Sequence, residues 1–270
     1  MLDRRAFLAL SATTPVAAAA EPVSCDVLVY GSTPGGIAAA VEAARQGLKV
    51  KLLCPQRHPG GMAASGLSTT DAVRPQLFDG LVAEFIAKVR THYQRLFADQ
   101  PAEYALVKDG WYYEPSVAEL AFVQLLEAEY AMLEWLPAHH LTAAGVAGRR
   151  LAWTEFETPQ NTTLRISART FIDGTYEGDL AAAARVPYRV GREAKAEHGE
   201  PFAGIHYMNW RTGEQILTPD TGEASPAIQA FCARSIFTVE PAHRVAIEKP
   251  DTYAEHLPDY LPLLDDFTSG

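Results

Sequence analysis

The feature that most constrains this sequence is a short apolar run that breaks directly into glycines. Val27–Tyr30 (VLVY) is followed at once by Gly31–Gly36 (GSTPGG), after which alanine-rich sequence resumes. Apolar, β-prone residues that end at a glycine predict a parallel strand covered on both faces. Thr33 is suited to cap a helix, and Pro34 to occupy its first position, where the missing N–H is no loss. We therefore expect a strand, a tight turn and a helix.

The predicted helix has one apolar face, formed by residues at helical spacing: Ile37, Ala40, Val41 and Ala44. Gly47 is a natural stop, and residues 48–53 are typical of a second strand. In such a βαβ unit, glycines let the backbone approach a diphosphate closely, and free N–H groups with the helix dipole attract its charge. A purely structural turn is the alternative for this motif taken alone. The predicted phosphate-binding residues are Gly31, Thr33, Pro34, Gly35 and Gly36.

Two positions depart from the usual dinucleotide pattern. Thr33 stands where the middle glycine of GxGxxG is found. Cys54 ends the second strand about 23 residues after Gly31, where an Asp or Glu usually accepts the ribose hydroxyls. A cysteine cannot accept two such hydrogen bonds as a carboxylate does. Either a neighbouring group makes the ribose contact, or the nucleotide is held less tightly than usual.

The N-terminal residues are typical of an export signal. An arginine pair precedes Ala6–Val16, a moderately apolar stretch too short for a stable membrane anchor, and Ala18 and Ala20 fit the small-residue rule for cleavage. Residues 1–20 are therefore predicted to be a twin-arginine-type signal peptide, with a disordered tail as the alternative. We expect the twin-arginine machinery to export the folded chain, with any cofactor, to the periplasm or the extracellular space.

Composition argues against several classes of protein. The 270 residues are 48% apolar and 21% charged, as in globular chains of one or two domains. A net charge of -10 argues against a nucleic-acid partner. The three cysteines are far apart and lack CxxC spacing, which argues against a disulfide framework or an all-cysteine metal site. His139 and His140 are adjacent, so a strand would point them to opposite sides, and no metal site is expected.

Two further motifs resemble a known family. Residues 60–67 contain Gly-Gly-Met followed by Ser-Gly-Leu, and residues 171–181 read FIDGTYEGDLA, with the resemblance continuing over 186–194. Together with the βαβ unit they resemble FAD-dependent oxidoreductases of the glutathione-reductase-like fold, in the group often labelled putative xanthan lyases or FAD-dependent dehydrogenases. The resemblance implies an α/β fold: a Rossmann-like FAD-binding domain with an inserted β-meander, followed by the start of a second, substrate or cap domain.

The resemblance also implies cofactor-binding residues. In the family the Gly-Gly-Met loop follows the diphosphate and ribityl parts of FAD, and the Asp of the later block lies near the flavin end. Carried over by position, the implied residues are Gly60, Gly61, Met62, Ser65, Gly66, Asp173, Gly174 and Glu177. Cys54 and Arg57, after the second strand, are also predicted to bind the cofactor. A backbone contact to adenine is implied around His140 and Leu141.

The later block also has an interpretation from its residues alone. Residues 164–172 alternate as a strand does, and Asp173-Gly174 interrupts them where ligands meet the carboxyl ends of strands in an open α/β sheet. The alternative is an ordinary strand-to-helix turn, in which Asp173 or Thr175 caps a helix containing Leu180–Ala184.

The predicted domain organisation has three parts: a signal peptide over 1–20, a FAD-binding domain over 21–194 with a β-meander at about 133–172, and a partial substrate or cap domain over 195–270. Periodicity predicts amphipathic helices over 77–97 and 116–133, and strands over 133–136 and 140–156 with a turn at 145–148. The resemblance implies a closing glycine-rich FAD contact after these segments. We therefore expect a chain truncated relative to the family, in which FAD retention is the open question.

The implied function is that of a FAD-dependent oxidoreductase. A small substrate, for which a carbohydrate-related molecule is one option, gives a hydride to the flavin, and an unidentified acceptor reoxidises it. The absence of a second glycine-motif unit disfavours an NAD(P)H-dependent reductase. The alternatives are an NAD-binding dehydrogenase, which Cys54 in place of the usual ribose acid disfavours, and a non-catalytic nucleotide-binding remnant. No catalytic residue is assigned. Two groups could line a substrate pocket, although packing or a surface position is the simpler interpretation: Trp111, Tyr112 and Tyr113, and His206, Tyr207 and Arg211.

Overall fold

The computed structural model describes residues 23–71, 74–205, 221–229, 234–235 and 237–268. The predicted signal peptide over 1–20, and with it the expected export signal, lies outside the described residues, as do His206, Tyr207 and Arg211. The chain divides into two compact units, residues 1–234 and 235–270. The second unit contains a short 3-10 helix, η4 (Pro241–His243), and the helix α8 (Tyr253–Thr268).

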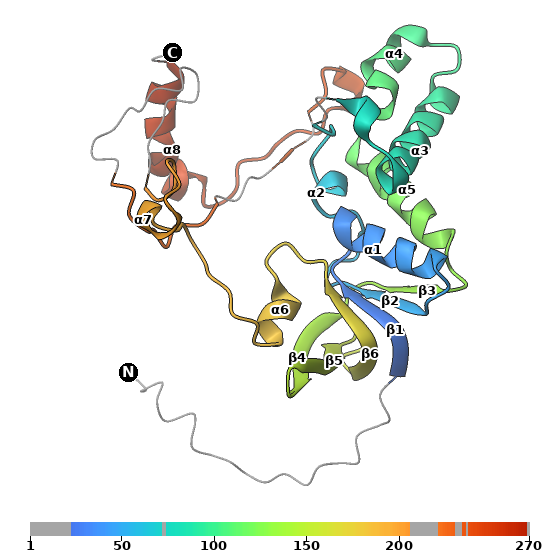
Figure 1. The fold of residues 1–270 in the computed structure, drawn as a ribbon. Helices are drawn as coiled ribbons and strands as arrows, with labels where there is room; N and C mark the ends of the chain where they lie inside the picture. The colour runs from blue at the N-terminus through green and yellow to red at the C-terminus, as the bar shows by residue number, and fades with distance from the viewer. Residues whose placement is uncertain (1–22, 72–73, 206–220, 230–233, 236, 269–270) are drawn as a thin grey trace. The chain divides into compact units, whose positions relative to one another are not determined.

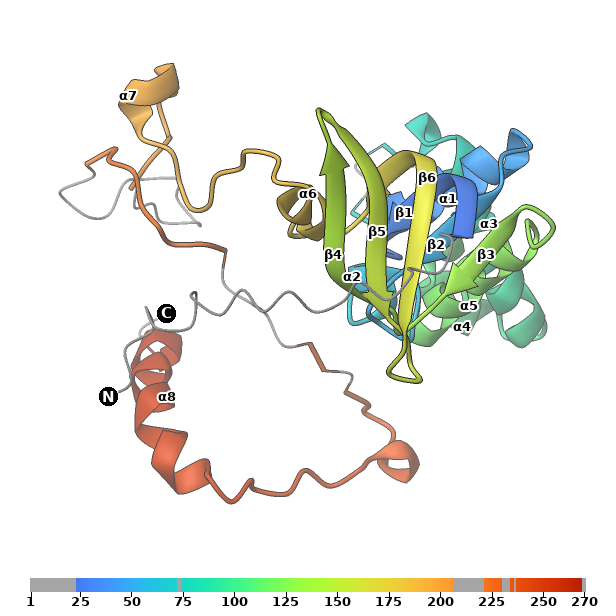
Figure 2. The ribbon, with the colours of Figure 1, turned by 90° about the horizontal axis from the view of Figure 1, so that it is seen from below.

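A six-stranded sheet organises the first unit, in the order β3-β2-β1-β6-β5-β4 (Figure 2). Its strands are β1 (Val23–Tyr30), β2 (Val50–Leu53), β3 (Leu133–Leu136), β4 (His140–Ala147), β5 (Arg150–Glu157) and β6 (Thr163–Asp173). β1 pairs in parallel with β2 and β6, and β2 with β3, whereas β5 pairs antiparallel with β4 and β6. The long strand β6 thus belongs to both a parallel sheet and an antiparallel meander, which confirms the α/β fold.

The helices of this unit gather mainly beside the parallel strands (Figure 1). They are α1 (Pro34–Arg45), α2 (Gly61–Ala64), α3 (Gly80–Leu96), α4 (Pro101–Leu106), α5 (Pro115–Glu127), α6 (Asp179–Ala183) and α7 (Lys195–His198), with 3-10 turns η2 (Pro75–Leu77) and η3 (Lys108–Gly110). α1 buries Ile37, Ala40, Val41 and Ala44, as its apolar spacing predicts.

β1 is covered on both faces, as the apolar run predicts. Val27 and Val29 belong to the core shared with α1, α3 and α5. Leu28 and Tyr30 belong to a second core on the meander side, with Phe156 of β5 among its members. Since successive side chains of a strand point to opposite faces, one four-residue run contributes to both cores.

Several predicted boundaries are wrong. β2 begins at Val50 instead of residue 48, because the Lys49 backbone binds Asp26: its N–H donates to the carboxylate and its carbonyl accepts the Asp26 N–H. The predicted helix over 77–97 divides into η2 and α3, and the one over 116–133 ends at Glu127, after which a turn leads into β3. β3 pairs in parallel with β2, so residues 133–136 are not part of the meander, and the predicted turn at 145–148 lies between Ala147 and Arg150.

Candidate functional site

The turn between β1 and α1 has the capped geometry that the sequence predicts. Thr33 is the N-cap, with its hydroxyl accepting from the Gly36 N–H at 3.2 Å, and Pro34 occupies the first position of the helix. The same hydroxyl donates to the carbonyl of Gly174, at 2.7 Å. Thr33, which departs from the glycine motif, therefore ties this turn to the one that follows β6.

Three glycines make close backbone packing possible where β1 and β6 end. Gly31 has φ +108°, a value that side chains rarely tolerate, and a Cβ there would lie 2.5 Å from the Gly174 carbonyl carbon. A Cβ on Gly36 would overlap the Gly31 carbonyl oxygen, and one on Gly174 would lie 2.8 Å from Gly36 Cα. The Gly174 N–H donates to Tyr30 O at 2.7 Å. Gly174 is therefore needed for packing between the two turns.

The first turn leaves backbone donors unused. In the part of the chain that the structure describes, the N–H groups of Ser32, Thr33 and Gly35 donate to no protein acceptor. Ser32 and Thr33 line a cavity of about 170 Å³. Free amides at the start of a 12-residue helix, beside the carboxyl ends of parallel strands, form a site suited to an anion such as a diphosphate.

Four segments of the chain surround this cavity, which we call the nucleotide cavity. Its lining residues are Gly31, Ser32 and Thr33 after β1; Pro55, Gln56 and His58 after β2; Gly61, Met62 and Ser65 in and beside α2; and Thr175, Tyr176, Glu177 and Asp179 after β6. Of the residues predicted to bind the cofactor, Gly31, Thr33, Gly61, Met62, Ser65 and Glu177 lie here. Sequence reasoning did not select Gln56, His58, Tyr176 or Asp179, although each is close to a residue that it did select.

The Gly-Gly-Met loop packs against the first turn. The Gly60 N–H donates to Ser32 O at 2.8 Å, and Gly60 and Gly61 both have positive φ, +104° and +51°. The Ser65 hydroxyl donates to Gly61 O at 2.8 Å. Gly60 is buried and Gly66 lies away from the cavity, so these two glycines shape the loop without lining the cavity.

Tyr176 crosses from the turn after β6 to this loop. Its hydroxyl accepts a hydrogen bond from the Met62 N–H at 2.8 Å, and a Cβ on Gly61 would overlap that hydroxyl. Tyr176 is 51% exposed, so burial does little to hold it in this position. The Tyr176 hydroxyl therefore accepts from the N–H group of Met62, a residue that lines the cavity.

The end of β2 differs from the prediction. Cys54 is fully buried, and its thiol donates to the Gln56 carbonyl at 3.2 Å instead of facing the cavity. Arg57 is exposed and does not line the cavity either. Gln56 and His58 do, and His58 Nδ1 lies 2.7 Å from Glu119 Oε1 of α5. The geometry therefore favours these two over Cys54 and Arg57, whose cofactor contacts stay predictions.

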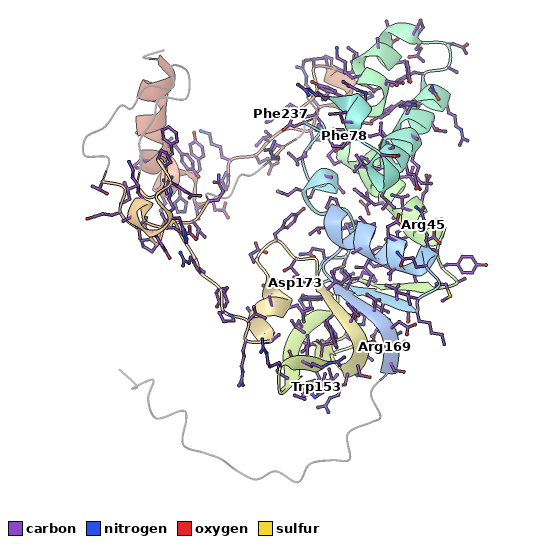
Figure 3. All side chains as sticks on the ribbon, in the orientation of Figure 1. Arg45, Phe78, Trp153, Arg169, Asp173 and Phe237 are labelled. Atoms are coloured by element: carbon purple, nitrogen blue, oxygen red, sulfur yellow. The ribbon has the colours of Figure 1, made fainter. Side chains whose placement is uncertain are left out.

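The turn after β6 satisfies several of its own donors with side chains. Asp173, labelled at the end of β6 in Figure 3, accepts from the Thr175 N–H at 3.0 Å, the Thr175 hydroxyl at 2.6 Å and the Ala181 N–H at 2.8 Å. The Thr175 hydroxyl accepts from the N–H groups of Gly178 and Asp179, both at 3.0 Å. Asp173 and Thr175 thus accept from N–H groups in the first turn of α6, as the structural alternative requires, although the N-cap residue itself is Gly178. Asp173 does not line the nucleotide cavity.

A second cavity, of about 350 Å³ and mostly apolar, lies on the other side of the same segments. Pro34 and Ala63 line it, whereas their neighbours Thr33 and Met62 line the nucleotide cavity. Tyr113 is buried here with its hydroxyl 3.3 Å from Thr70 Oγ1, and burial raises its pKa. Of the three aromatic residues noted in the sequence, only Tyr113 lines this cavity.

The structure also bears on the implied adenine contact, on metal sites and on membrane-spanning helices. The Leu141 N–H, near the implied adenine contact, donates to the Tyr30 hydroxyl at 3.1 Å, so this amide already has an acceptor. Within the described ranges, no group of three or more His, Cys, Asp or Glu side chains is placed to hold a metal ion. Among the same residues, no helix has both the length and the apolar character needed to cross a membrane.

Solved structures that resemble this chain share little sequence with it. The myxobacterial chondrochloren halogenase, described as FAD-dependent, is 18% identical over 57% of this chain and 38% of its own, with a TM-score of 0.41. Sdh1 from Mycobacterium smegmatis in its apo form is 15% identical over 73% of this chain and 44% of its own (TM-score 0.44). Glycerol-3-phosphate dehydrogenase from Bacillus halodurans, complexed with FAD, is 13% identical over 60% and 36% (TM-score 0.40). Similarity at this level says nothing about substrate.

The chain spans less than half the length of each of these structures. No curated protein matches its sequence. The family of FAD dependent oxidoreductases matches residues 26–268, which include the glycine turn, the Gly-Gly-Met loop and the block after β6. Because that match covers most of the sequence, this protein belongs to the FAD dependent oxidoreductase family.

Proposed function

We propose that this protein is a FAD-dependent oxidoreductase that passes a hydride from a small organic substrate to the flavin, with an unidentified acceptor reoxidising the cofactor. Family membership supports FAD as the cofactor. One observation carries the proposal: Ser32 and Thr33 line the nucleotide cavity, and their N–H groups have no acceptor among the described residues. Such donors at a helix start suit the diphosphate of FAD.

The residues present fit this cofactor, which supplies the redox chemistry when it is bound. Gly31 and Gly36 keep side chains out of the turn, so a diphosphate can approach the backbone closely. The dipole of α1 favours the negative charge at its start. Gly61 also lines the cavity, and its N–H has no acceptor among the described residues, so it adds a donor from the Gly-Gly-Met loop. The chain's own task is to bind and orient the cofactor.

The proposal also includes a binding site for the substrate. We place it in the apolar cavity, because that cavity adjoins the nucleotide cavity across Thr33-Pro34 and Met62-Ala63. A mostly apolar lining suits the carbon skeleton of a substrate better than the hydroxyl-rich surface of a sugar. The carbohydrate-related option therefore stays a prediction without support from these residues.

Export of the folded chain by the twin-arginine machinery likewise stays a proposal, tested by cell fractionation with both arginines of the signal changed to lysine.

The test of the cofactor is direct. The purified chain should be yellow, or should gain a flavin spectrum on reconstitution with FAD, and released cofactor should be identified as FAD by chromatography. NAD titrated into the same protein is the matched comparison, since it shares the adenosine diphosphate portion. A chain that takes up NAD but no flavin would favour the dehydrogenase alternative. A chain that melts cooperatively but responds to neither would favour the non-catalytic one.

A further inference from the structure

The end of β2 lacks the residue that normally holds the ribose of a bound dinucleotide. In this fold, an Asp or Glu about 20 residues after the glycine turn accepts hydrogen bonds from the ribose hydroxyls. Cys54 stands at that position, with no exposed surface and with its thiol donating to Gln56 O at 3.2 Å. The thiol is turned into the protein, so it cannot reach a ligand in the cavity.

Gln56 lies two residues further on and faces the cavity. Its carbonyl accepts hydrogen bonds from the Cys54 thiol and from the Ala138 N–H at 3.0 Å, which fix the peptide at this point. Gln56 is exposed and is among the residues that line the cavity, which leaves its side chain free to contact a ligand there. Its amide oxygen is a hydrogen-bond acceptor of the kind that a ribose hydroxyl requires.

His58 supplies a second acceptor on the same wall. Its Nδ1 lies 2.7 Å from Glu119 Oε1, and because a carboxylate can only accept, Nδ1 carries the hydrogen. In the neutral ring, Nε2 then has a free lone pair. Glu119 reaches His58 from α5, so it orients the ring without lining the cavity.

We propose that Gln56 and His58 form a neutral site for the ribose diol of the adenosine half of FAD. Gln56 Oε1 and His58 Nε2 each accept one ribose hydroxyl, in place of the two oxygens of a carboxylate. Glu119 is a positioning residue that holds His58 in the required tautomer. The identity of the cofactor as FAD rests on the proposed function, whereas the diol site itself requires only an adenosine nucleotide.

The experiment compares AMP with 2′-deoxy-AMP, which differ by one ribose hydroxyl, by titration of the full chain followed by NMR. Wild type should bind AMP more tightly by about 5-fold, the range expected for one net hydrogen bond. Gln56→Ala and His58→Ala should each reduce affinity for AMP, and one or both should lose the preference for AMP. Arg57→Ala is the matched control, since this exposed neighbour does not line the cavity, and it should keep the preference.

The positioning role of Glu119 has its own readout. Glu119→Gln keeps an oxygen that accepts from Nδ1 and should keep the preference for AMP, whereas Glu119→Leu should reduce it. Equal affinity of wild type for AMP and 2′-deoxy-AMP, or no binding of AMP, would overturn the diol site. Unchanged discrimination in both Gln56→Ala and His58→Ala would also overturn it. Discrimination without any FAD uptake would instead retain the diol site and reject the proposed flavin function.

Discussion

Two strand-to-helix turns lie at the same edge of the sheet, and they differ in how far side chains satisfy their backbone donors. The turn after β1 leaves the N–H groups of Ser32 and Thr33 without an acceptor in the described part of the chain. The turn after β6 satisfies four of its N–H groups, those of Thr175, Gly178, Asp179 and Ala181, through the Asp173 carboxylate and the Thr175 hydroxyl. Those of Tyr176 and Glu177 have no acceptor among the described residues. Both turns contain glycine and precede a helix. The side chains that accept from the backbone, and not the presence of a glycine, therefore distinguish the second turn, which uses its own carboxylate and hydroxyl to stabilise the fold, from the first.

The largest expected effect comes from closing the first turn. Gly36→Val places a Cβ onto the Gly31 carbonyl oxygen, so the turn must open or the chain must fail to fold. We expect complete loss of bound flavin, measured by absorbance after reconstitution with FAD. Gly35→Ala is the control, because a Cβ there meets only Thr33 Oγ1, at 3.9 Å. Flavin content unchanged by Gly36→Val would contradict the assignment of this turn.

The next effect tests the second turn. Asp173→Ala removes the acceptor of two backbone N–H groups and one hydroxyl, so the free energy of unfolding should fall by about 3 kcal/mol. The variant that still folds should bind FAD within about 2-fold of wild type, because Asp173 does not line the nucleotide cavity. Urea unfolding followed by circular dichroism, with FAD titration, separates the two quantities. A large loss of affinity for FAD without a loss of stability would show that Asp173 contacts the ligand.

A smaller effect is expected at the residue that joins the two turns. Thr33→Val keeps the branched shape but removes the hydroxyl that caps α1 and donates to Gly174 O. The free energy of unfolding should fall by about 1–2 kcal/mol, the usual cost of losing a helix cap. Ser65→Ala, which removes the hydroxyl bonded to Gly61 O within the neighbouring loop, is a comparison and should cost less. Equal stability of Thr33→Val and wild type would show that the two turns are not coupled through this side chain.

Local features were predictable, and contacts between distant segments were not. The sequence predicts β1, the Thr33 cap and the buried face of α1 because strand and helix periodicity and capping depend on neighbouring residues. Spacing also predicts that the ribose subsite lies at the end of β2. It cannot predict that Cys54 turns inward while Gln56 faces the cavity, because this depends on the Ala138 N–H from another strand connection. The contact between His58 and Glu119 joins segments 61 residues apart, and no local pattern reports it.

The smallest effect is expected at Tyr176, which follows β6 and hydrogen-bonds to the Gly-Gly-Met loop. Its hydroxyl occupies the Met62 N–H, one of the donors on the cavity wall, so a bound diphosphate must compete with it. Tyr176→Phe removes this competitor while keeping the ring, and should raise affinity for FAD by about 2- to 5-fold, as expected for release of one neutral hydrogen bond. Fluorescence quenching of FAD measures this change. Tyr188→Phe, which removes the hydroxyl of another exposed tyrosine outside the cavity, is the control and should have no effect. A weaker affinity in Tyr176→Phe would mean that the phenol contacts the cofactor directly, so that the turn after β6 also contributes to the binding site through this side chain.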